Sequence, residues 1–286
     1  MSNETSMAES YDDFPRIEEA FQHRLDESLD PSGPDSLLDL FGEVLATSNV
    51  TEVVDVGCGE GDDAVEIAHR FGLEVVGVDP IERHLELSRA AAIEAGVGLT
   101  FVEGTAEALP MADASTDVIF AKESLMYADL DAAFAEFRRV LRPGGFGFVY
   151  QVFTGPQMAD AEAPDYWSKN AGARSVRPDD MAEAIRSAGF NVTTRLDIGS
   201  EWGEFGQEQS GTPGRRLAHV ARLRREPERY IAEFGQAAYD IMLHDCLWHV
   251  YRMLGLLHAA VFVFHVPPRV CPLQHERLAV PAEMVR

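Results

Sequence analysis

The chain has 286 residues, a formal net charge of −24 and a pI near 4.6, and 46% of its residues are hydrophobic. A chain of this length can bury one large core and still carry an insertion. Its acidity argues against nucleic acid or an anionic membrane surface as a partner, because both are negatively charged.

The N-terminal residues and the cysteines indicate the cellular compartment in which the protein is expected. Residues 1–13 are polar and acidic, unlike a signal peptide. Cys58, Cys246 and Cys271 are widely spaced and odd in number, without the pattern of a disulfide framework or a zinc site. The longest apolar stretch, 254–266, is too short to span a membrane. We therefore expect a cytoplasmic protein.

Two helices are expected before the first strand. Residues 14–29 carry apolar side chains at helical spacing, and a Pro-Ser-Gly-Pro turn separates them from a second helix over 36–46. The sheet-and-helix core should begin near Glu52.

Residues 53–61 are the most informative stretch, with the sequence Val-Val-Asp-Val-Gly-Cys-Gly-Glu-Gly. A short β-branched run is typical of a buried parallel strand, and glycines at alternate positions let a ligand lie on the backbone. A helical pattern follows over 62–71, and a second strand over 74–78 leads to Asp79, where a carboxylate can grip ribose hydroxyls. This order indicates a site for a nucleotide-type cofactor.

The charge around this turn distinguishes between such cofactors. A dinucleotide fingerprint has its third glycine three residues after the second, and this chain has Asp62 there. Glu60, Asp62 and Asp63 suit the positive end of a helix but would repel a pyrophosphate. They would tolerate a cation, so an NAD-dependent oxidoreductase is disfavoured.

Later segments continue the alternation of strands and helices. Strands are expected over 101–103 and 115–120, and a helix over 134–141 is stopped by Pro-Gly-Gly before a fifth strand. A helix over 177–188 then precedes a sixth strand over 190–198.

Over roughly residues 35–200, these motifs resemble the class I S-adenosylmethionine (SAM)-dependent methyltransferases. The match is to the branch with the ubiquinone and menaquinone C-methyltransferases and many natural-product methyltransferases. The resemblance implies an α/β, Rossmann-like fold with a seven-stranded, mostly parallel sheet and helices on both faces. It also implies S-adenosyl-L-methionine, a sulfonium without phosphate, as the cofactor.

The resemblance implies cofactor-binding residues in the glycine-rich turn, after the second and third strands and at the end of the fourth: Asp55, Gly57, Cys58, Gly59, Gly61, Asp79, Pro80, Thr105, Ala106, Glu107 and Lys122. Thr105 departs from the family, which often has Asp there to accept from the adenine amine. Threonine can still accept a hydrogen bond, and Ala106 can contribute its backbone N–H.

The family commonly has a histidine near the place of Tyr127, and this chain has none. The sulfonium already activates the methyl group, so transfer needs mainly alignment and exclusion of water. A base helps only when the acceptor must lose a proton. The first candidates for this base are Glu123, Tyr127 and His244, and His23 and His249 are further candidates. The alternative is an acceptor that needs no base. Lys122 and Glu123 could instead form a salt bridge or a solvated pair.

Residues 199–256 stand where the family usually has a short hairpin, before an apolar run over 259–264 that is typical of a seventh strand. We expect an arginine-rich helix over 215–225 and a longer helix from about 228 to 254. Aromatic residues in this insertion need burial, and ligands of open α/β sheets bind at the carboxyl ends of the strands. A helical cap there would form the acceptor pocket.

The acceptor pocket is expected to contain Tyr127 with four residues of the longer helix: Ile241, His244, Trp248 and Tyr251. Core packing is the alternative for Trp248 and Tyr251. Helix packing is favoured over metal binding for His244, Asp245 and His249, and no metal is expected.

The sequence therefore predicts four parts: a tail and lid helix (1–35), a SAM-binding core (36–200), a helical cap (201–257) and the last strand with a tail (258–286). The predicted function is methyl transfer to a small, partly apolar acceptor in specialised or quinone-type metabolism. O-methylation comes first, with C- and N-methylation close behind, and a homodimer is one candidate state. The alternative is a non-catalytic SAM-binding regulator or partner subunit, whose cap would seal the pocket.

Overall fold

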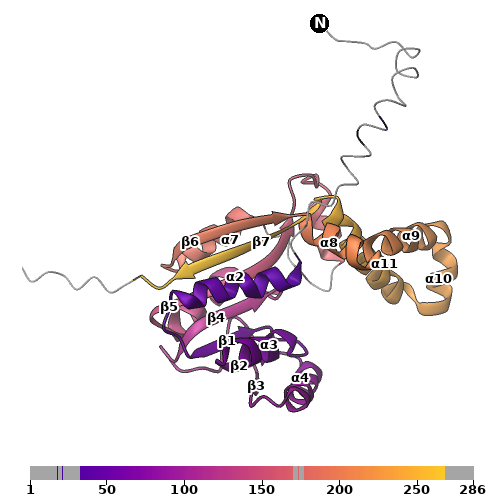
Figure 1. Ribbon diagram of the computed structural model, residues 1–286. Helices are drawn as coiled ribbons and strands as arrows, with labels where there is room; N and C mark the ends of the chain where they lie inside the picture. Colours follow the sequence, from indigo (N-terminus) through magenta and orange to yellow (C-terminus); the bar gives the residue numbers. More distant parts are fainter. Residues whose placement is uncertain (1–17, 19–20, 22–32, 170–172, 174–176, 268–286) are drawn as a thin grey trace, which may run out of the picture. The chain divides into compact units, whose positions relative to one another are not determined.

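The computed structural model describes residues 18, 21, 33–169, 173 and 177–267 (Figure 1). In this part of the chain, seven strands form one sheet in the order β3-β2-β1-β4-β5-β7-β6. The strands are β1 (Glu52–Val56), β2 (Glu74–Asp79), β3 (Thr100–Glu103), β4 (Thr116–Lys122), β5 (Leu141–Thr154), β6 (Asn191–Gly199) and β7 (Leu257–His265). The expected seven-stranded, mostly parallel sheet is confirmed.

The first five strands in the chain are parallel. β1 pairs with β2 and β4, β2 with β3, and β4 with β5. In a parallel sheet all carboxyl ends point to one edge, so the residues that follow β1, β2 and β4 come together there.

β7 runs antiparallel to its neighbours. Gly155 N donates to Leu256 O at 2.8 Å, while Val266 N donates to Gly145 O at 2.9 Å, so the two strands are traversed in opposite directions. The arrows of β6 and β7 likewise point in opposite directions in Figure 1. The sheet therefore ends in an antiparallel hairpin.

The helices are α2 (Pro34–Ala46), α3 (Asp62–Phe71), α4 (Glu82–Ala95), η1 (Leu125–Tyr127), α5 (Leu130–Val140), α6 (Ala163–Ser168), α7 (Pro178–Ser187), α8 (Glu201–Ser210), α9 (Thr212–Arg225), α10 (Pro227–Phe234) and α11 (Gln236–Met253). The chain divides into two compact units. We call the described residues within 48–151, 178–196 and 261–286 the sheet unit, and the described residues within 1–47, 152–177 and 197–260 the helical unit.

The sheet unit is held together by packed helix pairs and aromatic rings. α3 and α4 pack on each other and on β2, α4 also packs on β3, and α5 packs on α7. Phe264 of β7 lies edge-on to Phe134 and Phe190, with ring centroids 5.5 and 4.8 Å apart. A Cβ at Gly147 would lie 2.1 Å from the Phe264 ring, so this close approach requires glycine.

Two details of the helices and strands differ from the sequence expectation. The Pro-Gly-Gly segment does not separate α5 from β5. It lies within the span of β5, where the pairing of β4 with β5 shifts register between Thr116 and Val118. The predicted long helix over 228–254 is wrong: Gly235, at φ 86° and ψ 157°, separates α10 from α11.

In the helical unit α8, α9 and α11 pack on one another and α10 packs on α9 and α11; α9, α10 and α11 lie side by side in Figure 1. The expected helix over 14–29 lies outside the described residues, except for residues 18 and 21. Among the helices that the structure describes, none has the length and hydropathy needed to cross a membrane.

Candidate cofactor site

The glycine-rich loop after β1 takes a backbone path that glycine favours. Gly57, Gly59 and Gly61 have φ of 73°, 54° and 91°, a region that other residues rarely adopt. A Cβ at Gly57 would meet Ser124, and a Cβ at Gly61 would meet Ser88. Nothing lies within 4 Å of the corresponding position at Gly59. The loop is packed closely at both ends and leaves open space at its middle.

Asp79, at the end of β2, ties this loop to the start of α4. Its Oδ2 accepts a hydrogen bond from Gly59 N at 3.0 Å, and its Oδ1 accepts one from Ile81 N at 2.9 Å. His84 Nδ1 lies 3.1 Å from the same Oδ1. His84, in the first turn of α4, was not among the predicted site residues.

Asp55 is a buried carboxyl beside other acids. The residue is 2% exposed, and its Oδ2 has no hydrogen-bond partner among the described residues. Burial raises the pKa of Asp55 well above its ordinary value, and Asp63 raises it further, while Lys122 opposes the shift. A cationic group of a ligand would stabilise the charged form of this carboxyl.

Lys122, at the end of β4, forms an ion pair within the cofactor loop region. Its Nζ lies 2.8 and 2.9 Å from the two carboxylate oxygens of Asp63, in the first turn of α3. The salt bridge that the sequence left open for Lys122 therefore forms with Asp63. Next to it, Ser124 Oγ donates to Val56 O at 2.7 Å.

Glu123 follows Lys122 in a conformation that is uncommon for a residue with a side chain. Its φ is 53°, and its N–H donates to Tyr150 O at 2.9 Å. Such strain persists only where the surroundings enforce it, and it is frequent at functional sites. Tyr127 is half-exposed, and burial raises its pKa, with a further contribution from the negative charge of Glu123. Both lie after the strand end next to the glycine-rich loop.

The segment after β3 is a tight turn. Ala108 N donates to Thr105 O at 3.1 Å, and in this turn Thr105 is exposed and Ala106 is buried. Glu107 is held by a hydrogen bond from Asp129 N at 2.8 Å. Two other residues of the predicted set complete this region: Pro80, which is exposed, and Cys58, which is buried and whose thiol pKa is raised by burial.

The four α11 residues of the predicted acceptor pocket lie in the helical unit, with different surroundings. Ile241 is 65% exposed. The other three contact the rings of α6, in a group that we call the aromatic cluster: His244 with Tyr166 at 5.6 Å, Tyr251 with Tyr166 at 5.1 Å and Trp248 with Trp167 at 6.2 Å. His244 is buried, with Nδ1 2.8 Å from Asp240 O. Ile241 therefore does not share the environment of the other three.

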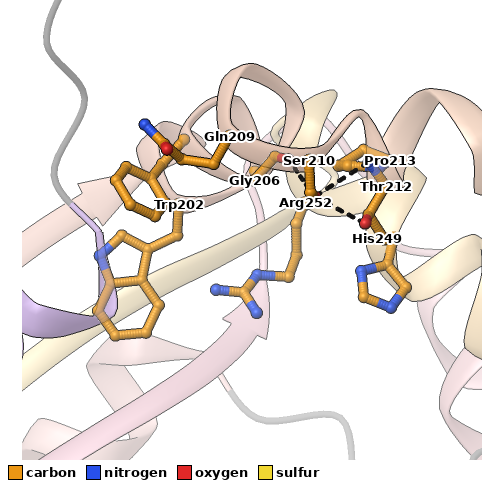
Figure 2. A pocket seen from close by; sticks show the side chains of 10 residues that line it. Trp202, Gly206, Gln209, Ser210, Thr212, Pro213, His249 and Arg252 are labelled. Atoms are coloured by element: carbon orange, nitrogen blue, oxygen red, sulfur yellow. Dashed lines mark hydrogen bonds between the residues drawn. The ribbon is translucent and has the colours of Figure 1, made fainter.

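A cavity of about 340 Å³ lies in the helical unit, lined by residues of α8, the start of α9 and α11 (Figure 2). The Arg252 guanidinium lies 5.7 Å from the Trp202 ring centroid. Ser210 Oγ donates to Gly206 O at 2.8 Å and lies 2.7 Å from Thr212 Oγ1. His249, named above as a base candidate, lines this cavity, and burial lowers its pKa. Across the described residues, no group of three or more His, Cys, Asp or Glu is arranged for a metal ion.

Fold and loop together define a Rossmann-like α/β protein with a nucleotide-type cofactor site. The sequence profile of the methyltransferase domain family matches residues 53–145. The chain is 31% identical over 165 residues to O-methyltransferase rstn1 of Aspergillus nomiae, covering 55% of this chain and 72% of that protein. The chain belongs to the methyltransferase family.

Two further comparisons place the chain more broadly. It is 31% identical over 155 residues to the ubiquinone biosynthesis O-methyltransferase of Chelativorans sp. (strain BNC1), covering 51% of this chain and 61% of that protein. The solved structure of the [4+2]-cyclase SpnF has a TM-score of 0.64 and 24% identity, with 82% of each chain covered. The latter shows the common fold.

Proposed function

We propose that this protein binds S-adenosyl-L-methionine and transfers its methyl group to a small, partly apolar acceptor. The observation that carries the proposal is the loop of Gly57, Gly59 and Gly61, anchored by Asp79 and backed by the buried Asp55. The loop is lined with carboxylates, which suit a sulfonium and repel a pyrophosphate. Membership of the methyltransferase family supports the same cofactor.

The residues present fit the parts of this cofactor. Asp79 would accept from the ribose hydroxyls, and the turn at Thr105 and Ala106 would face the adenine. Open space at Gly59 admits a ligand against the backbone. Asp55 would stabilise a cationic group of the cofactor. Lys122, which is paired with Asp63, would lie near the carboxylate of the cofactor's methionine part. When bound, the cofactor supplies a methyl group already activated by positive charge.

The chain's own contribution to the reaction is then to orient the acceptor, exclude water and, where needed, accept a proton. We assign the proton to the Glu123 carboxylate, whose backbone is held at positive φ beside the cofactor loop. Tyr127, whose pKa is raised by burial and further by the charge of Glu123, would donate a hydrogen bond to the acceptor. His244 is less suited, because it is buried and already contacts Asp240 O.

The acceptor contacts predicted for Ile241, His244, Trp248 and Tyr251 of α11 remain predictions from the sequence. O-methylation is our first choice for the reaction, supported by the names of the O-methyltransferase relatives. A phosphoethanolamine N-methyltransferase of Arabidopsis thaliana, 26% identical over 192 residues, keeps N-methylation open.

A small molecule is the only partner that the proposed chemistry needs. The net charge of −24 argues against nucleic acid. Cys58 and Cys246 are free thiols, which supports a reducing, cytoplasmic setting. Whether the protein acts as a homodimer is open to measurement by light scattering.

The test is calorimetric titration with S-adenosylmethionine, S-adenosylhomocysteine and NAD, followed by a methyl-transfer assay on phenols, catechols and amines. We expect micromolar binding of the first two, no binding of NAD, and methylation of a phenolic acceptor. NAD binding without a response to S-adenosylmethionine would overturn the assignment. A protein of this fold can carry another activity, as the name of SpnF indicates, so binding without transfer would support the SAM-binding regulator instead.

A further inference from the structure

The carboxylate of Asp79 has a limited capacity to accept hydrogen bonds. Its two oxygens offer about four lone-pair positions in all. Gly59 N occupies one on Oδ2, and Ile81 N occupies one on Oδ1. His84 Nδ1, at 3.1 Å, occupies a second on Oδ1. An ionised carboxylate can only accept, so this contact requires the imidazole proton to be on Nδ1.

A ribose diol that binds in the bidentate manner places one hydroxyl on each carboxylate oxygen. Oδ2 has room for a second donor beside Gly59 N. Oδ1 would then receive three donors: Ile81 N, His84 Nδ1 and a hydroxyl. One of them must leave, because two positions cannot take three donors.

His84 is the donor that is free to leave. The other two donors are backbone N–H groups, one in the glycine-rich loop and one immediately before α4, and neither can move without moving the chain. The His84 side chain is 31% exposed, so rotation about its side-chain bonds takes Nδ1 to solvent, where water replaces the lost contact.

We propose that His84 competes with the cofactor ribose for Oδ1 of Asp79, and so sets the affinity of the site for ligands that carry an intact ribose diol. The inference rests on the proposed function, because it takes Asp79 as the ribose ligand. In the absence of a ligand, the His84 contact satisfies the carboxylate. Binding exchanges the imidazole N–H for a ribose hydroxyl.

The experiment compares three variants with the wild type by calorimetric titration with S-adenosylhomocysteine and with its 2′-deoxyribose analogue. In His84→Leu, the donor is removed and the size of the side chain is kept. His84→Asn keeps an N–H donor close to the position of Nδ1. His69→Leu, on the last turn of α3, is the control for loss of an exposed histidine.

His84→Leu should bind S-adenosylhomocysteine roughly 3- to 10-fold more tightly than the wild type, since no contact is given up. His84→Asn and His69→Leu should bind like the wild type. With the deoxy analogue, one hydroxyl fewer needs a position on the Asp79 carboxylate, so His84 need not leave. The affinity of His84→Leu for this analogue should therefore be close to that of the wild type. Circular dichroism confirms that each variant is folded.

Two results would overturn the proposal. Equal or weaker binding of S-adenosylhomocysteine by a folded His84→Leu would mean that His84 does not compete. An equal gain with the deoxy analogue would mean that the effect does not pass through the diol. If the wild type binds neither ligand, the proposed function itself fails, and that outcome is visible before any variant is compared.

Discussion

The Asp55 carboxyl destabilises the folded protein whenever it is ionised and no cation lies beside it. Its pKa is raised in the fold, so its favourable contribution to stability is complete below the unfolded pKa, about 3.9, and is lost as the pH rises through the folded value. Asp55→Asn should therefore raise the free energy of unfolding near pH 8 by roughly 0.5–2 kcal/mol. Urea denaturation at pH 5 and pH 8 measures this, and the gain should be larger at pH 8.

The same substitution should weaken S-adenosylmethionine binding, because it removes the charge that faces the cation. Stability and binding would thus change in opposite directions, which separates this role from a purely structural one. Glu94→Gln, on the exposed side of α4, is the control for loss of one negative charge. A less stable Asp55→Asn with unchanged binding would contradict the assignment.

Asp79 is expected to provide the strongest single contact to the cofactor. Asp79→Ala removes a charged acceptor worth roughly 1.5–3 kcal/mol, so the Kd for S-adenosylmethionine should rise by about 10- to 150-fold. Glu74→Gln, at the exposed start of the same strand, should leave the Kd unchanged. Because Asp79 also holds Gly59 N, a thermal melt is needed beside the titration. Unchanged affinity in a folded Asp79→Ala would show that the ribose lies elsewhere.

Glu123 combines a strained backbone with a carboxylate, and two variants separate these features. Glu123→Gln should lower kcat by about 10²- to 10⁴-fold for a phenolic acceptor, the usual contribution of a general base, with S-adenosylmethionine affinity kept. Glu123→Gly should lose the same activity. Because glycine adopts a positive φ without strain, this variant should melt at a higher temperature than Glu123→Gln. Full activity of Glu123→Gln would point to an acceptor that needs no base.

The sequence identified the residue types of the site better than their contacts. Gly57, Gly59, Gly61 and Asp79 follow from spacing along one short segment, and the structure brings them together. The partner of Lys122 could not be predicted, because Asp63 is 59 residues away and the pairing depends on how β4 lies beside β1. His84 was missed because one histidine in a helical turn carries no pattern.

At the scale of helices and strands, periodicity located the elements, and local backbone geometry decided where they end. Residues 228–254 have a helical pattern throughout, yet Gly235 adopts φ 86° and ψ 157°, which only glycine reaches easily. Residues 143–145, Pro-Gly-Gly, were expected to end the preceding helix before the fifth strand, yet they lie within β5, where its pairing with β4 shifts register as in a bulge. Hydrophobic pattern does not report such conformations.

Replacing Gly235 tests this explanation of the break between α10 and α11. Gly235→Ala should destabilise the helical unit by roughly 1–3 kcal/mol, because a Cβ is strained in that conformation. Gly98→Ala has open space around its Cβ and no positive φ, so it should be close to neutral. Urea melts followed by circular dichroism measure both. A stabilised Gly235→Ala would mean that α10 and α11 can join into one helix.

At the scale of the whole molecule, the charge of −24 affects stability rather than fold. Excess negative charge repels itself in the compact state, and salt screens that repulsion, with a Debye length that falls from about 10 Å at 0.1 M to about 3 Å at 1 M. The Tm should therefore rise as KCl is increased from about 0.05 to about 1 M, a range over which the Debye length shortens roughly fourfold. Each kcal/mol by which screening weakens the repulsion should raise the Tm by roughly 2–4 °C for a chain of about this length.

The control for this salt effect is the same titration near pH 4.6, where the net charge approaches zero and the rise should shrink. A rise of equal size at both pH values would assign it to general salting-out of apolar surface, as described for excluded salts. A Tm that falls with KCl at neutral pH would show that the ion pairs, such as Lys122 with Asp63, outweigh the self-repulsion. The acid-rich composition would then stabilise the protein through local pairing, and its net charge would not limit the fold.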